Sequence, residues 1–455
     1  MKKTVFILLF ALILSGFAQC QTTAFALADP PAIAGETAIL IDAKTGVILY
    51  EKSKDVLREP ASTTKMMTCL LALENLPLDK VLTIDAESPF TGGSRIYVIE
   101  GEELTVEQLL YAMMLESAND TAVALAIAIS GSVDEFTSLM NERARELGAK
   151  NPSFKNPNGL SLEGHLASAY DLALIAQEAM SIPEFRKIVS TVQYTIPQTN
   201  KQPAREYIHT TNRLIYDEET KVSVKGVMTP VKYKGATGVK TGYTPQAGGT
   251  LVASAERDGT ELIAVVLAST DMGRFADCIS LLDFGFDNFY TYKAIDSNIK
   301  LDDIEIKRGA VRYTDVKIAE DRYITLPKEA SLSLITTKVV VDEGLTAPIE
   351  AGRTVGKIEV YEGGKLIEEV PVIAVTAVPE GGFLSRFGIE DSLAKYIYTG
   401  AFIAAGVLVL IIAVYIGLKI RRESKRRARR AKRAMEIAKE MERKRKDMEQ
   451  RRWPY

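Results

Sequence analysis

Histidine is scarce in this chain of 455 residues. Only two occur, His165 and His209, and neither stands in an H-x-x-x-H spacing typical of zinc sites or beside a G-x-S-x-G sequence. A zinc peptidase and a hydrolase with a Ser-His-Asp triad are therefore disfavoured, because each needs histidine in a defined pattern. We expect neither a metal nor another cofactor.

Cysteine is nearly as scarce, with three residues in the whole chain. Cys20 lies in a leader-like segment at the N-terminus, which leaves Cys69 and Cys278 for the folded protein. Two cysteines do not build the disulfide framework that stabilises small exported domains. We interpret both as small buried apolar residues, and a bridge between them is disfavoured.

The first residues have the pattern of a secretory signal. Two lysines precede an apolar run over residues 5–14, and small residues follow. This run is too short for a permanent membrane span, so we predict a signal peptide over residues 1–28, cleaved after Ala26 or Ala28. A lipoprotein signal at Cys20 is disfavoured because the residue before it is not small.

The C-terminal part has the pattern of a membrane anchor. Residues 396–418 contain no charged residue, and about 23 residues of helix suffice to cross a hydrocarbon layer. So long an uncharged run disfavours a buried helix of a soluble domain. We predict one transmembrane helix there, a linker over residues 379–395 before it, and a basic tail over residues 419–455 after it.

The distribution of charge gives the expected orientation. The tail carries about +11, and the whole chain has a formal net charge of −3, so the part before the tail is acidic. Basic residues next to a span favour the cytoplasmic side and anionic lipid headgroups. The acidic remainder gives no electrostatic case for binding nucleic acid. We therefore predict a single-pass protein of the cell membrane whose folded part lies on the extracytoplasmic face.

Between these ends, apolar patterning indicates two folded domains. Residues 29–291 open with a strand pair in TAILIDAKTGVILY, continue with helical periodicity over residues 62–76 and 104–129, and end in strand-like segments. This order predicts an α/β (α+β) domain in which helices flank an antiparallel sheet and form a helical lobe. Residues 292–378 alternate apolar and polar side chains, with a Gly-Gly hairpin turn, and predict a small all-β domain.

Three short motifs occur in order along the first domain. Ser62-Thr63-Thr64-Lys65 opens a helical segment, so its spacing places the serine and the lysine on one helix face. Ser117-Ala118-Asn119 follows the apolar run LLYAMMLE, and Lys240-Thr241-Gly242 precedes a strand of small residues. A lysine can take a proton from serine when burial and a second cation disfavour its ammonium form. The set is the signature of class A β-lactamases and penicillin-binding proteins.

The sequence around the motifs resembles the low-molecular-mass penicillin-binding proteins, which are serine-type D-alanyl-D-alanine carboxypeptidases of the peptidase S11 family. The resemblance rests on PASTTKMMTCLLALE, ESANDTAVALA, SAYDLALIA and GVKTGYTPQAGGTLVASA. It implies a serine β-lactamase/transpeptidase-like fold followed by the β domain that accompanies these enzymes. It also implies removal of the terminal D-alanine from peptidoglycan stem peptides that end in D-Ala-D-Ala, and covalent inhibition by β-lactam antibiotics.

The resemblance also assigns the catalytic roles. Ser62 is expected to be the acyl-enzyme nucleophile, and Lys65 the general base that accepts its proton. Ser117 is expected to relay a proton to the departing amine, and Asn119 to hold the substrate amide and the base; a helix cap is the alternative for both. A like charge on Lys240 favours a neutral amine on its neighbour, so the two lysines are expected to titrate as a coupled pair.

Substrate-binding residues follow from the same resemblance. Lys240, Thr241 and Gly242 are expected to line the cleft, where the first two bind the carboxylate of the terminal D-alanine. The backbone N–H groups of the nucleophile and of Tyr243 are expected to form the oxyanion hole. Arg274 is a further candidate for the carboxylate, against the alternative of a surface arginine.

One position departs from the family pattern. Many members carry histidine where this chain has Asn158, in the sequence KNPNGL. Because Asn-Gly is a turn signal, we interpret Asn158 as structural.

Three other functions are considered. A class A β-lactamase would share the motifs, but the sequence contains no E-x-x-L-N element for a deacylating glutamate. A D,D-endopeptidase differs only in the peptide that fits the cleft, which the motifs do not decide. A non-catalytic wall-binding scaffold would depend on the β domain, and the intact motif residues disfavour it.

Overall fold

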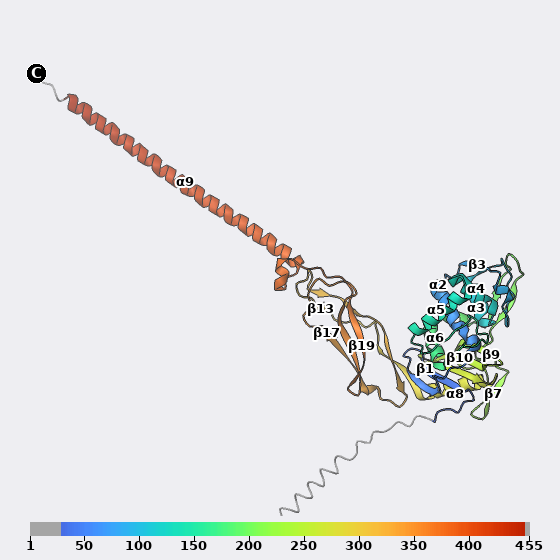
Figure 1. Cartoon of the computed structure of the whole chain (residues 1–455). Helices are drawn as coiled ribbons and strands as arrows, with labels where there is room; N and C mark the ends of the chain where they lie inside the picture. The colour runs from blue at the N-terminus through green and yellow to red at the C-terminus, as the bar shows by residue number, and fades with distance from the viewer. Residues whose placement is uncertain (1–28, 451–455) are drawn as a thin grey trace, which may run out of the picture. The chain divides into compact units, whose positions relative to one another are not determined.

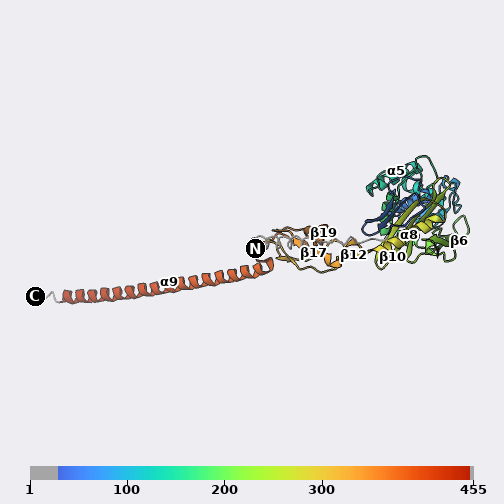
Figure 2. The ribbon, with the colours of Figure 1, turned by 90° about the horizontal axis from the view of Figure 1, so that it is seen from below.

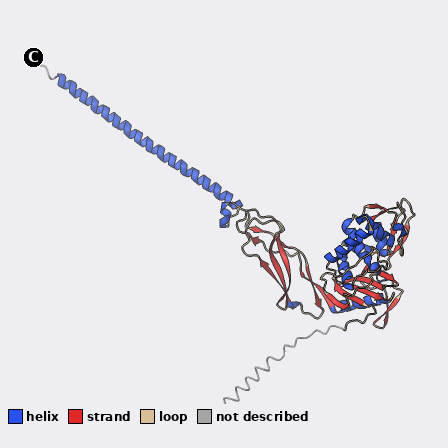
Figure 3. Cartoon of the chain, viewed as in Figure 1, coloured by secondary structure: helices blue, strands red, loops and turns tan. Residues whose placement is uncertain are grey.

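The computed structural model describes residues 29–450, so the predicted signal peptide lies outside the described residues. These residues form two compact units. The first runs to Ile295 and includes Arg322–Ile335, and the second holds Asp296–Asp321 and the chain from Thr336 onward. The first unit combines helices with strands, whereas in the second a group of strands precedes one long helix (Figure 1, Figure 3).

A five-stranded antiparallel sheet lies at the centre of the first unit, with the strand order β2-β1-β11-β10-β9. The register pairs Ile39 on β1 with Val265 on β11, so the start of the domain lies beside its end. The strands are β1 (Thr37–Asp42), β2 (Ile48–Lys52), β9 (Ala236–Thr244), β10 (Gly248–Arg257) and β11 (Thr260–Ser269).

Helices cover both faces of this sheet, and Figure 2 shows α5 and α8 on its two sides. The helices are α2 (Lys65–Asn75), α3 (Val106–Leu115), α4 (Asn119–Ser130), α5 (Val133–Glu146), α6 (Ala169–Ser181), α7 (Pro183–Val189) and α8 (Gly273–Asn288). Because strand side chains alternate between the two faces, β11 contributes to two apolar cores. Ile263 and Val265 belong to the core beneath α2 to α7, and Leu262 and Ala264 belong to the core beneath α8. This is the predicted antiparallel sheet flanked by helices, with a helical lobe.

Short strand pairs and 3-10 turns complete the first unit. The pair β12–β16 joins segments separated by part of the second unit. The pairs are β3 (Val81–Thr83) with β4 (Glu103–Thr105), β5 (Gln193–Ile196) with β6 (Arg205–His209), β7 (Lys221–Val224) with β8 (Val227–Pro230), and β12 (Phe289–Ile295) with β16 (Arg322–Pro327). The 3-10 turns are η1 (Ala61–Thr64), η2 (Ser88–Phe90), η3 (Arg213–Ile215) and η4 (Leu332–Leu334).

The prediction of helical structure over residues 104–129 is wrong in two details. The segment starts in β4, and the helical part is divided into α3 and α4 at Ser117, which has a φ of +61°. Both helices are buried over most of their length, so the apolar pattern continues through the break and gives no sign of it.

The two described cysteines agree with their interpretation as buried apolar residues. Cys69 and Cys278 are both 0% exposed, and neither forms a disulfide. They belong to the cores on opposite faces of the sheet, so the sheet itself separates them.

The second unit contains the predicted small β domain. Its four-stranded sheet has the order β15-β19-β18-β17, and β18 and β19 are joined by the expected turn, in which Gly363 and Gly364 have positive φ. Val355, Val360 and Val370, all 0% exposed, belong to its core. The elements are β13 (Ile304–Glu305), β14 (Tyr313–Thr314), β15 (Val316–Ile318), β17 (Ile335–Val341), β18 (Thr354–Glu362), β19 (Lys365–Ala374) and η5 (Phe383–Phe387).

The last element is α9 (Asp391–Gln450), a continuous helix of 60 residues. It is long and apolar enough to cross a membrane, as the uncharged run over residues 396–418 predicts. The basic segment continues the same helix up to Gln450, which makes α9 about 90 Å long.

Candidate active site

The turn that carries Ser62 is fixed to the sheet by hydrogen bonds. This turn is η1, which leads directly into α2. The carbonyl oxygen of Pro60 accepts hydrogen bonds from Thr63 Oγ1 (2.6 Å) and from Thr250 Oγ1 on β10 (3.1 Å). The other three residues of η1 are buried, and only Ser62 is partly exposed. Its hydroxyl is therefore the group of this turn that a substrate can reach.

Lys65 lies directly beneath this hydroxyl. Its side chain is 0% exposed, and Nζ lies 3.1 Å from Ser62 Oγ. Nζ also donates to Asn119 Oδ1 (2.6 Å) and to the backbone oxygen of Asn158 (2.5 Å). Three neutral oxygens thus surround the amine, and none of these contacts supplies a carboxylate to stabilise a positive charge.

This environment disfavours the ammonium form of Lys65. Burial is the main cause that brings its pKa well below the usual value, and the charge of Lys240 adds to the effect. Asp120 acts in the opposite direction. A neutral amine next to a serine hydroxyl can accept its proton, which is the requirement for a general base.

The break between α3 and α4 carries Ser117 and Asn119, and the side chain of Asn119 contacts Lys65. Ser117 Oγ is buried and has no hydrogen-bond partner among the described residues. Asn119 opens α4, but its side chain does not cap the helix: Oδ1 accepts from Lys65 and Nδ2 donates to the carbonyl of Gly92 (2.7 Å). The helix-cap alternative therefore does not describe either side chain.

The Lys-Thr-Gly motif lies on β9, which runs alongside η1. A Cβ added at Gly242 would lie 2.3 Å from Thr250 Oγ1 and 2.8 Å from the backbone nitrogen of Ser62. Only glycine permits this approach, since real Cβ contacts under 3.0 Å essentially never occur. Thr241 Oγ1 is hydrogen-bonded to Thr211 Oγ1 (2.6 Å). The edge of β9 and the turn of η1 thus bring two backbone segments together.

Lys240 is the second buried amine of the site. It is 1% exposed, and burial lowers its pKa to about 7, with a further contribution from the charge of Arg274. Glu116 acts in the opposite direction. A modest change in surroundings, such as a bound carboxylate, is therefore enough to set its protonation state near neutral pH.

Arg274 and Tyr243 occupy different environments. Arg274 is 9% exposed, so the alternative of a surface arginine is wrong, and its Nη1 donates to the carbonyl oxygen of Gly242 (2.7 Å). Its Nη2 forms an ion pair with Asp271 (2.7 Å). Arg274 is thereby bound to the backbone of β9. The side chain of Tyr243 is 58% exposed, and its backbone directly follows Gly242, which approaches the backbone of Ser62.

Sequence reasoning missed the contribution of the Asn158 turn. The side chain of Asn158 accepts from Leu160 N (3.0 Å), as expected for a turn residue, but its carbonyl oxygen contacts Lys65. Gly159 has a φ of +85°, and a Cβ there would lie 1.9 Å from the carbonyl oxygen of Ala61. The only signal was the Asn-Gly dipeptide, because a backbone acceptor has no side-chain signature.

The sequence patterns also predicted no structural role for His165. Its Nδ1 accepts from Lys155 N (2.9 Å), and its Nε2 lies 2.9 Å from Thr64 Oγ1 within η1. Burial, assisted by nearby lysines, lowers its pKa to about 4, so the ring is neutral at neutral pH. We interpret it as a support for the turn that carries Ser62.

A helical lobe that faces an antiparallel sheet, with Ser-x-x-Lys and Ser-x-Asn on the lobe and Lys-Thr-Gly on the adjoining strand, defines a penicillin-binding, transpeptidase-like domain. The pattern of the D-alanyl-D-alanine carboxypeptidase family, peptidase S11, matches residues 24–271. The pattern of the C-terminal domain of penicillin-binding protein 5 matches residues 289–380. The chain belongs to the D-alanyl-D-alanine carboxypeptidases of peptidase family S11.

Individual relatives agree with this assignment. The chain is 34% identical over 397 residues to the D-alanyl-D-alanine carboxypeptidase DacF of Bacillus subtilis, covering 85% of this chain and 97% of DacF. It is 32% identical over 372 residues to DacA of Escherichia coli K12, covering 78% and 86%. The crystal structure of penicillin-binding protein 5 from Haemophilus influenzae superposes with a TM-score of 0.61 at 29% identity, covering 77% of this chain and 99% of that one.

Proposed function

We propose that this D-alanyl-D-alanine carboxypeptidase acts through an acyl-enzyme on Ser62. The observation that carries the proposal is the buried Nζ of Lys65, 3.1 Å from Ser62 Oγ, with no carboxylate among its hydrogen-bond partners. In the first step, Lys65 accepts the hydroxyl proton while Oγ attacks the carbonyl carbon between the two D-alanines. Backbone N–H groups of Ser62 and Tyr243 hold the oxyanion.

The intermediate then collapses with transfer of a proton to the departing amine. Ser117 is suited to this step, because its buried hydroxyl has no partner among the described residues and so is free to bond to substrate. Asn119 orients Lys65 through Oδ1, and the second N–H of its Nδ2 is offered to the substrate. D-Alanine leaves, and water hydrolyses the ester to restore Ser62.

The terminal carboxylate of the substrate is assigned to Lys240 and Thr241 on β9. A bound carboxylate favours the charged form of Lys240, which raises the pKa that burial has lowered to about 7. Arg274 stabilises the same strand through the carbonyl of Gly242 and adds positive charge behind it. The substrate class is peptidoglycan stem peptides that end in D-Ala-D-Ala, and β-lactams are covalent inhibitors at the same serine.

The proposed location is the outer face of the cell membrane. Export by a signal peptide over residues 1–28, anchoring by residues 396–418 of α9 and a cytoplasmic tail over residues 419–455 account for the charge pattern of the chain. The catalytic domain, residues 29–291, and the β domain, residues 292–378, then lie outside the cytoplasm.

Mass spectrometry of the full chain tests the mechanism. The protein is incubated with a diacyl-L-Lys-D-Ala-D-Ala peptide and separately with benzylpenicillin. Release of D-alanine together with a penicilloyl adduct on Ser62 is expected, and Ser62→Ala should abolish both. An adduct without D-alanine would favour an endopeptidase, and labelling of the Ser62→Ala variant would refute the assignment of the nucleophile.

A further inference from the structure

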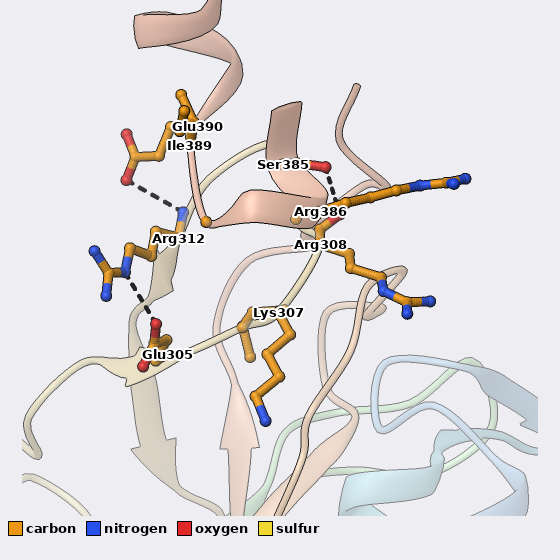
Figure 4. A pocket seen from close by; sticks show the side chains of 11 residues that line it. Glu305, Lys307, Arg308, Arg312, Ser385, Arg386, Ile389 and Glu390 are labelled. Atoms are coloured by element: carbon orange, nitrogen blue, oxygen red, sulfur yellow. Dashed lines mark hydrogen bonds and ion pairs between the residues drawn. The ribbon is translucent and has the colours of Figure 1, made fainter. Parts of the chain in front are cut away.

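A small cavity lies in the second unit where the β domain meets the first turn of α9. Its volume is about 260 Å³. It is enclosed by the segment between β13 and β14, by η5 and by the residues that begin α9, as Figure 4 shows. Four cationic side chains and two carboxylates line it: Lys307, Arg308, Arg312, Arg386, Glu305 and Glu390.

Backbone hydrogen bonds hold the parts of this cavity together. Asp391 N at the start of α9 donates to the carbonyl of Ala310 (3.0 Å), and Gly381 N donates to that of Arg308 (2.9 Å). A Cβ added at Gly309 would lie 2.5 Å from the carbonyl oxygen of Val311, so this segment is tightly turned. The membrane helix and the β domain are therefore joined here by defined contacts.

The charges around the cavity are unequally satisfied. Arg312 Nε donates to Glu305 (2.9 Å), and its backbone N–H donates to Glu390 (3.2 Å). Arg308 and Arg386 have no carboxylate partner among residues 29–450. Figure 4 shows these two side chains extending in the same direction, away from Arg312. Both carboxylates are thus engaged, while two guanidinium groups are available to an anion.

The position along the chain places this cavity at the height of lipid headgroups. Only the first turn of α9 separates Asp391 from Tyr396, where the uncharged run begins, and that turn rises about 8 Å. The headgroup layer on each side of a bilayer is of similar thickness. Phe383 and Phe387 on η5 are 66% and 70% exposed, which suits a boundary between water and acyl chains.

We propose that this cavity binds the phosphate of an anionic phospholipid headgroup through Arg308 and Arg386, while Phe383 and Phe387 contact the upper acyl chains. Guanidinium groups form paired hydrogen bonds to phosphate, and each basic residue near an anionic surface attracts it by about 1 kcal/mol. The proposal depends on α9 as the membrane span and is independent of the chemistry at Ser62. The β domain is thereby attached to the membrane at two points.

The test uses the full chain in nanodiscs. Replacing Trp453 by Phe removes the only tryptophan, and Phe387→Trp supplies a reporter on η5. Nanodiscs are made from phosphatidylcholine with an increasing fraction of phosphatidylglycerol, both brominated on the acyl chains. Tryptophan quenching is expected to increase with the phosphatidylglycerol fraction. In the double variant Arg308→Gln with Arg386→Gln, the fraction of phosphatidylglycerol needed for the same quenching should rise by about fivefold for each arginine removed.

A matched control removes two charges elsewhere in the same unit. Lys338→Gln with Lys365→Gln alters two exposed positions outside the cavity and should leave the lipid dependence unchanged. Equal quenching with and without phosphatidylglycerol, or an equal loss in the control, would overturn the proposal. Abolition of the lipid dependence by inorganic phosphate would do so too, because the ligand would then be a free anion.

Discussion

The two units of the chain place positive charge in opposite environments. In the first unit, Lys65 and Lys240 are 0% and 1% exposed, and burial lowers the pKa of both. In the second unit, Arg308 and Arg386 line an open cavity without carboxylate partners among the described residues. Lysine gives up its proton when buried, whereas arginine keeps its charge in proteins. In the proposed mechanism Lys65 therefore moves a proton, whereas Arg308 and Arg386 are suited to hold an anion.

Removal of the buried amine of Lys65 should give the largest effect. Lys65→Ala is expected to slow penicilloyl adduct formation by about 100-fold to 10,000-fold, the usual contribution of general-base catalysis. Stopped-flow or quenched mass spectrometry of the adduct measures the rate. Lys365→Ala, an exposed lysine of the second unit, should have no effect. Normal acylation by Lys65→Ala would remove it as the base.

Enlargement of Gly242 should give the next largest effect. In Gly242→Ala the new Cβ would press on Thr250 Oγ1 and on the backbone of Ser62. We expect acylation to slow by about tenfold or more and the free energy of unfolding to fall by about 1–3 kcal/mol. Gly400→Ala in α9 is the control, since its Cβ meets nothing within 4 Å and it belongs to the second unit. Equal rates for both variants would contradict the close approach of β9 to η1.

The pH dependence of acylation should report the charge interaction between Lys65 and Lys240. The rate should rise as Lys65 loses its proton, with a midpoint well below the ordinary lysine value, because burial and then Lys240 lower its pKa. In Lys240→Met the like charge is absent, so the protonated form of Lys65 is less disfavoured and the midpoint should move to higher pH. Second-order rates with benzylpenicillin across pH measure this. An unchanged midpoint would show that the charge of Lys240 does not act on Lys65.

The smallest effect is expected in the second unit. Gly364 has a φ of +86° in the turn between β18 and β19, where an alanine side chain is strained by about 1 kcal/mol. In Gly364→Ala the amides of this hairpin should exchange hydrogen about fivefold faster. Acylation should not change, since the hairpin and the serine belong to different units. Slower acylation would indicate coupling between the units.

The sequence predicted what local spacing determines. Ser62 and Lys65 are three residues apart on adjoining helical turns, so their proximity follows from geometry. The meeting of Asn119 with Lys65 was expected only from the family resemblance, because 54 residues separate them.

Other features had no local signature at all. The carbonyl of Asn158 contributes through its backbone, and the positive φ of Ser117 lies within an unbroken apolar pattern. Strand β16 pairs with β12 although the chain between these two strands belongs to the second unit. Such long-range contacts arise from tertiary packing, which periodicity and propensity do not encode.

The two glycines that flank η1 have a consequence for antibiotic resistance. The turn that carries Ser62 lies between the backbones of Gly159 and Gly242, and neither position has room for a side chain. Added bulk at either position would press on the backbone of Ser62, and in the proposed mechanism the natural peptide would lose its nucleophile together with the antibiotic. A side chain at Gly159 or Gly242 is therefore expected to impair the reaction with the natural peptide as much as the reaction with a β-lactam.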